Sequence, residues 1–383
     1  MTLSALFRLR VSAACVVVLS GSAATTARAL VKFNDAHDEI FITGTAGVTY
    51  DSNIFASNGG EDDTSCNASL DLEYRRKAGM LGVNGDLGWN FSKFQEFSSE
   101  DFANPHARLE VTKDSGRTTG SVTAGARRES RSDSAINIRT TSWEYDTGLN
   151  VKYPVIERYS LTGQASWNRS DFLDNLSLVD LDTWTLSTDL FYVYNSQRDL
   201  FGGYRFRVTD TTADTQDIDH AFTVGTSGKI ISTINGSARV GYQLRESNRT
   251  DGTRETFDGF TSAVSATWSG FTHLNVTGQL SSDFETIATD VSVSTTAAGL
   301  DAQYALNARF SLYAGAAVGR SRFLGEAGGG RRDTYLSYNA GVAYTLNDHL
   351  KATFGYIWFE NWSTLAFSDY TRDTISLNLS SRW

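Results

Sequence analysis

Residues 66–74 read CNASLDLEY, and apolar and polar side chains alternate along this stretch without a break. The apolar set is Cys66, Ala68, Leu70, Leu72 and Tyr74, and the polar set is Asn67, Ser69, Asp71 and Glu73. Successive side chains of a β-strand point to opposite faces of the sheet, so a period of two indicates a strand with one apolar and one polar face. A helix would require a period near 3.6.

The same alternation recurs along the chain, interrupted by turn residues. It predicts strands at 39–50, 65–75, 79–92, 102–112, 117–128, 140–153, 158–168, 182–195, 199–209, 218–230, 233–246, 256–268, 271–282, 291–305, 308–321, 333–346, 349–359 and 371–383. Each stretch reaches the roughly 9 to 11 residues that a tilted strand needs to cross a bilayer, and an even number of strands is typical of bacterial barrels. The sequence therefore predicts an all-β fold, a transmembrane antiparallel up-and-down β-barrel of about 18 strands.

Connections of two lengths alternate between these strands. Short turns are expected around Lys77, Asp114, Pro154, Gln197, Ser232, Gly270, Asn307 and Asp348. Long connections are expected at 51–64, 168–181, 247–255 and 360–370. Because bacterial barrels have short periplasmic turns and longer outer loops, this order predicts that both ends of the barrel chain lie on the periplasmic side.

Aromatic residues gather near both ends of the predicted strands, as in the girdles of membrane barrels. At the short-turn ends they are Tyr74, Tyr153, Tyr159, Tyr194, Trp268, Tyr304, Phe310 and Tyr344. At the long-loop ends they are Tyr50, Phe91, Trp143, Trp167, Trp184, Phe260 and Trp358. The alternative is the core of a soluble β-sandwich, in which Greek-key connections of mixed length would be expected.

The composition fits continuous strand pairing. The 383 residues contain only two prolines, and proline cannot donate to a β-ladder. The formal net charge of -10 argues against nucleic acid as a partner.

The N-terminus has the features of a secretory signal. Arg8 and Arg10 precede an apolar core at 11–24, and the small-residue motif Ala-Arg-Ala ends at Ala29. We therefore predict a signal peptide at residues 1–29 and an outer-membrane β-barrel at residues 30–383.

The last predicted strand carries an apolar face that ends in an aromatic residue. This face consists of Ile375, Leu377, Leu379 and Trp383. It resembles the terminal strand signal that the insertion machinery of outer-membrane barrels reads, although Phe is the commoner final residue. We predict that these four residues form the insertion signal.

Residues 48–55, VTYDSNIF, lie at the end of the first predicted strand. They resemble the opening signature of the second "putative β-barrel porin" family, many of whose members accompany exopolysaccharide or capsule export systems. This resemblance implies an outer-membrane barrel linked to polysaccharide secretion, and it carries no catalytic residues. The residues alone equally allow Asp51 and Asn53 to cap the first outer loop through side-chain to backbone hydrogen bonds.

Residues that could carry catalysis or bind metal are sparse. None of the five histidines is paired at ligand spacing. We predict no metal site, no cofactor and no enzymatic activity.

The alternation also predicts which charged side chains line the lumen. On the second to sixth predicted strands they are acidic: Asp71, Glu73, Asp86, Glu110, Glu144 and Asp146. On the ninth to eleventh they are basic: Arg205, Arg207, Lys229, Arg239 and Arg245. Facing walls of opposite sign would create a transverse field that admits polar solutes. The alternative is local ion pairing between neighbouring strands.

These features predict a channel-forming barrel that passes a polar solute or polysaccharide and is accessory to exopolysaccharide secretion. One alternative is a general diffusion porin for small nutrients, and another is a structural or adhesive surface barrel without transport. The expected partners are outer-membrane lipid and lipopolysaccharide, the barrel assembly machinery and polysaccharide export components. The expected location is the cell outer membrane.

Overall fold

The computed structural model describes residues 30–33, 37–133, 136–173 and 177–383, so the expected signal peptide lies outside the described residues. One antiparallel sheet of 19 strands contains most of the described chain. Its short first strand, β1 (Val31–Phe33), pairs only with the start of β2. The others are β2 (Asp38–Asp51), β3 (Asp63–Ala78), β4 (Leu81–Phe94), β5 (Phe102–Lys113), β6 (Thr119–Asp133), β7 (Ile138–Ile156), β8 (Tyr159–Leu173), β9 (Leu181–Asn195), β10 (Arg198–Thr211), β11 (Gln216–Ile231), β12 (Ile234–Asn248), β13 (Arg254–Phe271), β14 (Leu274–Ile287), β15 (Val291–Ala305), β16 (Phe310–Phe323), β17 (Arg332–Thr345), β18 (Leu350–Ser363) and β19 (Tyr370–Arg382).

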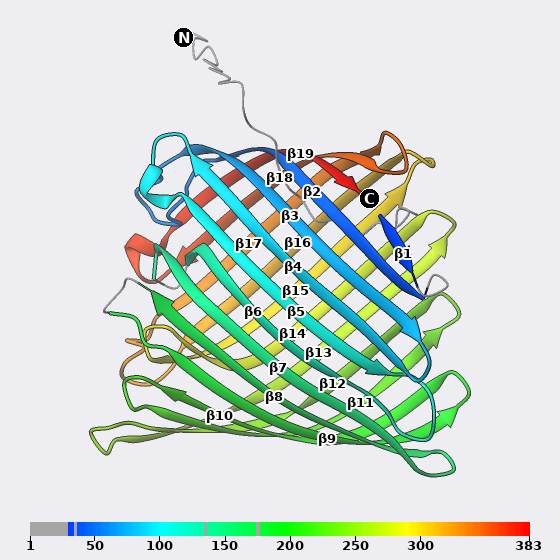
Figure 1. The fold of residues 1–383 in the computed structure, drawn as a ribbon. Coiled ribbons are helices and arrows are strands. Elements are labelled where there is room, and N and C mark those ends of the chain that lie inside the picture. Colours follow the sequence, from blue (N-terminus) through cyan, green and yellow to red (C-terminus); the bar gives the residue numbers. More distant parts are fainter. Residues whose placement is uncertain (1–29, 34–36, 134–135, 174–176) are drawn as a thin grey trace.

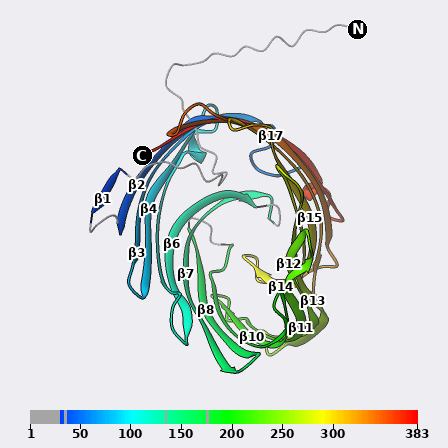
Figure 2. The same cartoon turned by 90° about the vertical axis from the view of Figure 1, so that its right-hand side faces the viewer.

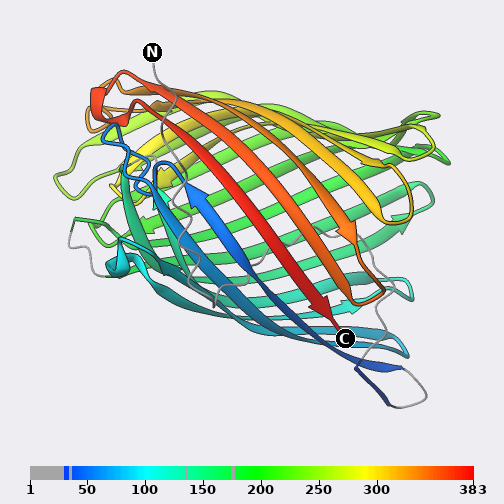
Figure 3. The same ribbon diagram turned by 90° about the horizontal axis from the view of Figure 1, so that it is seen from above.

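The sheet closes on itself between β19 and β2, and the strands tilt steeply around the barrel (Figure 1). Beyond the last paired strand residues, Trp383 and Ile42 exchange two backbone hydrogen bonds of 2.9 Å. Seen from above, the red β19 lies beside the blue β2 and runs in the opposite direction (Figure 3). Each of the predicted strands corresponds to one of β2 to β19, so the predicted 18-stranded barrel is confirmed.

The barrel is apolar outside and polar inside. Leu186 and Leu377, expected on the apolar face, are 52% and 60% exposed. The largest fully buried side chains include those of Arg245, Gln243 and Asp219. This distribution is the reverse of that in a soluble protein, and it is the one expected when lipid covers the outside of the barrel.

Two of the short turns, those between β17 and β18 and between β15 and β16, are built on asparagine. The side-chain oxygen of Asn347 accepts hydrogen bonds from the backbone N–H groups of His349 and Leu350, at 2.9 and 2.8 Å. Asn307 makes the same kind of turn between β15 and β16. These side chains mimic a backbone turn and fix the register of the hairpins that they join.

The opposite end of the barrel is less regular than the predicted alternation of lengths. Some connections there are long, such as residues 52–62 between β2 and β3. Residues 134–137 and 288–290, however, are short connections at the same end. These two are short because the strands that they join stay paired with each other after their pairing with the next strand of the wall has stopped.

Aromatic side chains pack in pairs near both ends of the strands. The ring centres of Trp167 and Trp184 lie 6.2 Å apart near the long-loop end. Those of Phe310 and Tyr344 lie 4.5 Å apart at the short-turn end. Among the described residues, no helix has the length and apolar character to cross a membrane.

Candidate functional site: the constricted lumen

The outer end of the β14–β15 hairpin leaves the barrel wall and enters the lumen. Pairing between β13 and β14 stops at Ser262 and Ser282, although β13 continues eight residues further, to Arg254. The hairpin itself stays intact, with Ile287 opposite Val291. Figure 2, which looks into the barrel, shows this tip in yellow inside the ring of strands. We call residues 283–293 the β14–β15 tip.

Arginines on β10 and β12 hold this tip. Arg205 donates to both carboxylate oxygens of Asp283, at 2.7 and 2.8 Å. Arg207 donates to the backbone oxygen of Phe284 at 2.5 Å, and Arg245 donates to that of Glu285 at 3.0 Å. Because β11, β12 and β13 separate β10 from β14 in the sheet, these contacts require the tip to lie inside the barrel.

The aromatic residue of the tip, Phe284, is turned inward. Strand alternation would point Phe284 at the lipid, yet only 3% of it is exposed. Its ring lies against Gly259 of β13, where an added Cβ would be 3.3 Å from the ring. The guanidinium of Arg245 lies 5.5 Å from the centre of the same ring. Phe284 therefore packs on the inner face of β13, the strand that the tip has left.

The turn of the tip is attached to two neighbouring outer loops. The carboxylate of Asp290 accepts hydrogen bonds from the hydroxyls of Thr211 and Thr215, at 3.0 and 2.7 Å. The backbone N–H of Val179 donates to the oxygen of Ala288 at 2.8 Å. These contacts fix the tip across the outer part of the lumen.

The arginine cluster of the predicted basic wall does not carry a net positive charge that could produce the expected transverse field. Its arginines lie inside the barrel as expected, but Asp189, Asp217, Asp219 and Asp283 accompany them. Arg239 donates to both oxygens of Asp189 at 2.8 Å. The physical reason is that a guanidinium shielded from water needs a counter-charge close by. Local pairing, the alternative reading, is what the structure shows.

Arg245 is fully buried and pairs with two carboxylates. It binds both Asp217 and Asp219, which are each 1% exposed, with distances of 3.2 and 2.6 Å. Arg207 also binds Asp219, with its Nη2 atom 2.5 Å from the Oδ2 atom that Arg245 shares. Lys229 lies apart from this cluster, near the short-turn end of β11, and is half-buried.

The residues expected on the acidic wall lie on β3, β4, β5 and β7, and most of them have partners. His106 lies between Asp71 and Asp86, with its Nε2 atom 3.2 and 3.1 Å from their oxygens. Glu73 binds Arg382 of β19 and Arg75, both at 2.5 Å. The two arginines reduce the net charge of this wall as well.

The other predicted acidic residues make looser contacts. Glu144 accepts hydrogen bonds from the hydroxyls of Ser142 and Ser170, at 2.8 and 2.6 Å. Asp146 lies 3.9 Å from Arg127, and Glu110 is half-buried on β5. Whether any of the predicted residues lines a conducting pore stays a prediction.

The end of the β6–β7 hairpin also bends into the lumen, where Figure 2 shows it curving inside the ring. Pairing between β5 and β6 stops at His106 and Arg127. The next residue of β5 is Pro105, which has no N–H to donate, so the ladder cannot continue there in the regular way. We call residues 128–133 with 136–140 the β6–β7 tip.

Contacts with distant strands hold the β6–β7 tip. Arg372 of β19 donates to the hydroxyl of Ser132 at 2.8 Å and binds Asp51 of β2. The amide of Asn137 donates to the backbone oxygen of Ala56 at 2.6 Å, and its oxygen accepts a hydrogen bond from Ser368 at 2.5 Å. The tip therefore rests on the loops that flank the closure of the barrel.

The motif at 48–55 lies at the start of the first outer loop, which contacts the β6–β7 tip. Asp51 accepts a hydrogen bond from the backbone N–H of Asn53 at 3.0 Å, and Asn53 is only 2% exposed. The amide of Asn53 donates to the backbone oxygens of Ser57 and Thr371, at 2.7 and 3.2 Å. The motif thus caps the first outer loop, as the alternative reading of these residues expected.

A cavity of about 320 Å³ lies between the two tips and the wall formed by β16, β17 and β18. Ser132 and Asp133 of one tip line it on one side, and Glu285 and Ile287 of the other tip line it on the other side. This space, which we call the aperture, lies between two structures that narrow the outer part of the lumen.

Aromatic rings form part of the aperture. Tyr335 of β17 and Phe359 of β18 line it, and their ring centres lie 5.6 Å apart at an interplanar angle of 20°. Tyr370 of β19 stacks on the far side of Phe359 at 5.5 Å. Strand alternation in the sequence points Tyr335 into the lumen, as it does Phe191, Phe201 and Tyr313. Phe359 was not among the expected residues, because attention fell on its outward neighbour Trp358.

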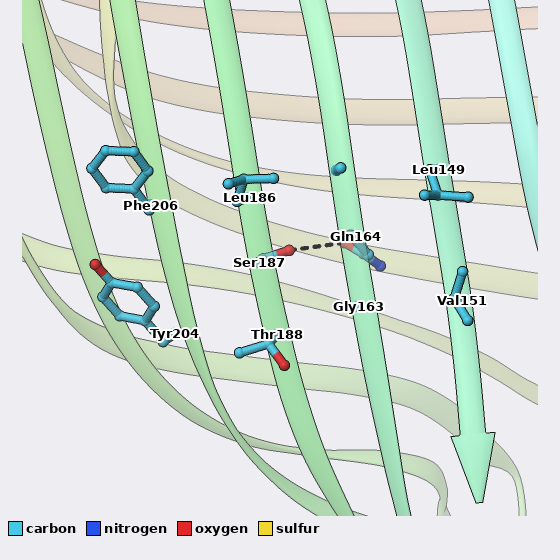
Figure 4. Close-up of a pocket in the computed structure, with 10 residues that line it drawn as sticks. Leu149, Val151, Gly163, Gln164, Leu186, Ser187, Thr188, Tyr204 and Phe206 are labelled. Atoms are coloured by element: carbon cyan, nitrogen blue, oxygen red, sulfur yellow. Dashed lines mark hydrogen bonds between the residues drawn. The ribbon is translucent and has the colours of Figure 1, made fainter.

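A larger hollow lies on the outside of the barrel, over β7, β8, β9 and β10 (Figure 4). It measures about 540 Å³, and Leu149, Leu186 and Phe206 line it around the small residues Gly163 and Ala165. Most of its lining, apart from Gln164 and Ser187, belongs to the outward apolar band, so it lies outside the path of a polar solute. In the part of the chain that the structure describes, no three His, Cys, Asp or Glu side chains are grouped as metal ligands.

Comparison with known proteins agrees with this architecture. The family model described as "Putative beta-barrel porin 2" matches residues 218–382. The predicted resemblance to this family is confirmed over that part of the chain, which runs from β11 to β19. The motif at 48–55 lies outside the matched part. No curated protein sequence gives a significant match.

Several solved barrels share the fold at low sequence identity. OccK2 (OpdF) of Pseudomonas aeruginosa in complex with glucuronate has a TM-score of 0.53 and 11% identity, over 92% of this chain and 99% of that chain. OccK9 (OpdG) of the same organism has a TM-score of 0.52 and 12% identity, over 92% and 100%. The FrpB iron transporter of Neisseria meningitidis has a TM-score of 0.51 and 9% identity, over 84% of this chain. The present chain spans 62% of the length of that transporter structure. These likenesses show a porin-like barrel fold.

Proposed function

We propose that this protein is an outer-membrane channel whose lumen, narrowed by two inward-folded hairpins, passes polar solutes. The observation that carries the proposal is the aperture, a cavity of about 320 Å³ whose lining consists mainly of charged, amide, hydroxyl and aromatic side chains, although Ile287 and Val293 on one side pack with Phe323. A purely structural barrel would gain more stability from apolar packing there, because buried polar groups must each find a partner.

We further propose that the solute is a saccharide and that the channel is accessory to polysaccharide secretion. The family match and the aromatic row of Tyr335, Phe359 and Tyr370 support this. A general porin for small nutrients fits the same fold and family. The two differ in whether loss of the protein affects secretion of polymer or uptake of nutrients.

A structural barrel without transport is a second candidate, and a specific observation favours it. The buried arginine network and the contacts of the two tips would also suit a lumen that stays shut. Charge pairs with this much burial are held in one arrangement rather than exchanging freely with water.

Planar-bilayer recording of the purified, folded protein tests the channel. We expect discrete ion-conducting steps that disappear when the protein is denatured before addition. The absence of steps in preparations that show heat-modifiable gel mobility would favour the structural barrel. Deletion of the gene should lower secreted polysaccharide, whereas slower nutrient uptake with normal secretion would favour the general porin.

A further inference from the structure

We propose that a hollow on the inner wall of β6 to β9 binds one segment of an uncharged polyhydroxyl chain, such as a neutral polysaccharide. The proposal rests on the proposed function, because the chain would reach this wall through the lumen. The hollow measures about 200 Å³, and its β6 residues lie where β6 is still paired with β5. Seven hydroxyl and amide side chains line it: Ser121, Thr123, Asn150, Gln164, Ser166, Thr185 and Ser187. Gly148, Leu149 and Ala165 complete the lining of this space, which we call the hydroxyl hollow.

The side chains of the hydroxyl hollow form a regular grid on the lumen side of the wall. Val122 and Leu186, which are their neighbours in sequence, point outward and are 53% and 52% exposed. The backbone ladders set two rows across the four strands, with Ser121, Asn150, Gln164 and Ser187 in one and Thr123, Gly148, Ser166 and Thr185 in the other. Side chains within a row are roughly 4.8 Å apart, and the two rows are roughly 6.8 Å apart. Gly148 keeps the grid open, because a Cβ at this position would be 2.7 Å from the Oγ1 atom of Thr123.

Most of these polar groups have no partner in the protein. Within the part of the chain that the structure describes, no side-chain hydrogen bond engages Ser121, Thr123, Asn150, Ser166 or Thr185. Gln164 and Ser187 bond only to each other, at 3.3 Å (Figure 4). In the arginine cluster, by contrast, the hydroxyls are occupied, since Thr286 and Ser292 both donate to Asp217. The groups of the hydroxyl hollow are therefore available to a solute.

The charges that border the hydroxyl hollow are of both signs. The next inward positions along its strands include Lys152, Asp146 and Asp189. Asp189 is bound by Arg239 at 2.8 Å, and Asp146 lies 3.9 Å from Arg127. Among the residues that line the hollow itself, none is ionisable. A charged ligand therefore finds no counter-charge inside the hollow.

An uncharged polyhydroxyl ligand matches this surface. The hydroxyl and amide groups of the hollow can both donate and accept hydrogen bonds, and so can the hydroxyls of a sugar. A sugar hydroxyl can therefore replace a water molecule bound to the wall without loss of hydrogen bonds, whereas an apolar solute cannot. At roughly 30 Å³ per water molecule, the 200 Å³ of the hollow hold about six or seven waters. This space suits one ring of a chain that continues along the lumen.

The test uses purified full-length barrel in planar bilayers and three uncharged probes, maltohexaose, isomaltohexaose and cellohexaose. We expect at least one of them to interrupt the ionic current in brief, concentration-dependent closures. Polyethylene glycol of matched mass has no hydroxyl donors along its chain, and it should block at least about tenfold more weakly, which corresponds to about 1.4 kcal/mol. Equal block by polyethylene glycol, or no block by any of the three sugars, would overturn the proposal.

Two matched variants assign the site. Ser166→Ala with Thr185→Val removes two hydroxyls that face each other across β8 and β9, and should weaken block by the active sugar at least about fivefold. Ser337→Ala with Thr345→Val makes the same two changes at inward positions of β17, nine strands away from β8 in the ring. This control should leave block within about twofold of the native value. Equal losses in the two double variants would show that the hydroxyl hollow is not the site.

Calorimetric titration of the detergent-solubilised barrel with the same sugars separates this proposal from the channel itself. Binding that needs Ser166 and Thr185, in a protein without conductance, would support the site and refute the channel. Conductance without block and without calorimetric binding would refute the site and leave the channel standing.

Discussion

Arg205 on β10 and Asp283 on β14 form a two-point ion pair, with distances of 2.7 and 2.8 Å, across three intervening strands. Neighbouring strands of a barrel are joined by backbone ladders, whereas this contact spans the interior. It is one of several side-chain contacts that keep the β14–β15 tip inside the lumen. The width of the aperture therefore depends on side chains that the barrel wall does not need for its own hydrogen bonding.

Replacing Asp283 by Ala should loosen the tip and widen the path through the barrel. Arg205 and Arg207 would each lose a carboxylate partner, at an expected cost of about 1–3 kcal/mol to the attachment of the tip. We expect larger and noisier single-channel conductance with unchanged strand content by circular dichroism. Glu246→Ala, which breaks the exposed pair with Arg254, is the matched control and should behave like the native protein. Identical conductance in both variants would show that the tip does not restrict the path.

The two ends of the barrel should differ in their access from outside the cell. Asp251 lies in the exposed connection between β12 and β13, and Asp348 lies in the exposed turn between β17 and β18. In a Cys66→Ser background, a cysteine at position 251 should react with an impermeant thiol reagent on intact cells, and one at 348 should react only after lysis. Labelling at 348 alone would invert the assignment of sides, and labelling of both on intact cells would contradict the topology.

Adjacent residues on β9 should respond in opposite ways to the same substitution. Leu186 points outward and is 52% exposed, whereas Ser187 points inward and donates to Gln164 at 3.3 Å (Figure 4). Leu186→Arg places a charge in the lipid-facing band and should destabilise the folded barrel by about 2–4 kcal/mol. Ser187→Arg should leave assembly intact, because the lumen is polar. Comparable folding yields of the two variants into lipid vesicles would argue against the assigned faces.

The end of the chain should be needed for assembly. Trp383 completes the closure by pairing with Ile42, and its ring stacks on His349 at 4.1 Å with an angle of 5°. Removing Arg382 and Trp383 should lower the amount of protein in the outer membrane and leave degraded or periplasmic chains, as measured by fractionation and immunoblotting. The single change His349→Ala, which removes the stacking but not the backbone pairing, should have a much smaller effect. Normal outer-membrane levels of the truncated chain would place the insertion signal elsewhere.

The strands were predictable from sequence because their cause is local. A period of two forces one face toward lipid and the other toward the lumen, and the alternation continues through each strand whatever its neighbours are. The expected strand 291–305, for example, coincides with β15. Closure followed from the same pattern, since an open edge would leave backbone groups unpaired in lipid.

The constriction was not predictable by the same means. Alternation assigns a face to a side chain, but it does not reveal where a strand bends away from its neighbour. Asp283 and Phe284 lie just beyond the expected end of their strand, at 282, and Phe284 points inward against the alternation. Pro105 was a local signal for the other bend, because a proline that cannot donate marks a possible end of pairing. The partners of the arginines on β10 and β12 lie up to 78 residues away in the sequence, so only the fold brings them together.

The departure of the two hairpin tips from the wall makes the diameter of the barrel and the width of its opening depend on different residues. Barrel diameter is set by the number of strands and by the stagger of the ladders, which continue, with bulges beside some of the turns, in the half of the barrel that carries the short turns. The opening that a solute meets is set by residues 128–133 and 283–293, which lie outside those ladders on one side. Substitutions in these two segments can therefore change which solutes fit through the opening while the diameter of the barrel stays the same. Selectivity can diverge among relatives without any change in the fold of the wall.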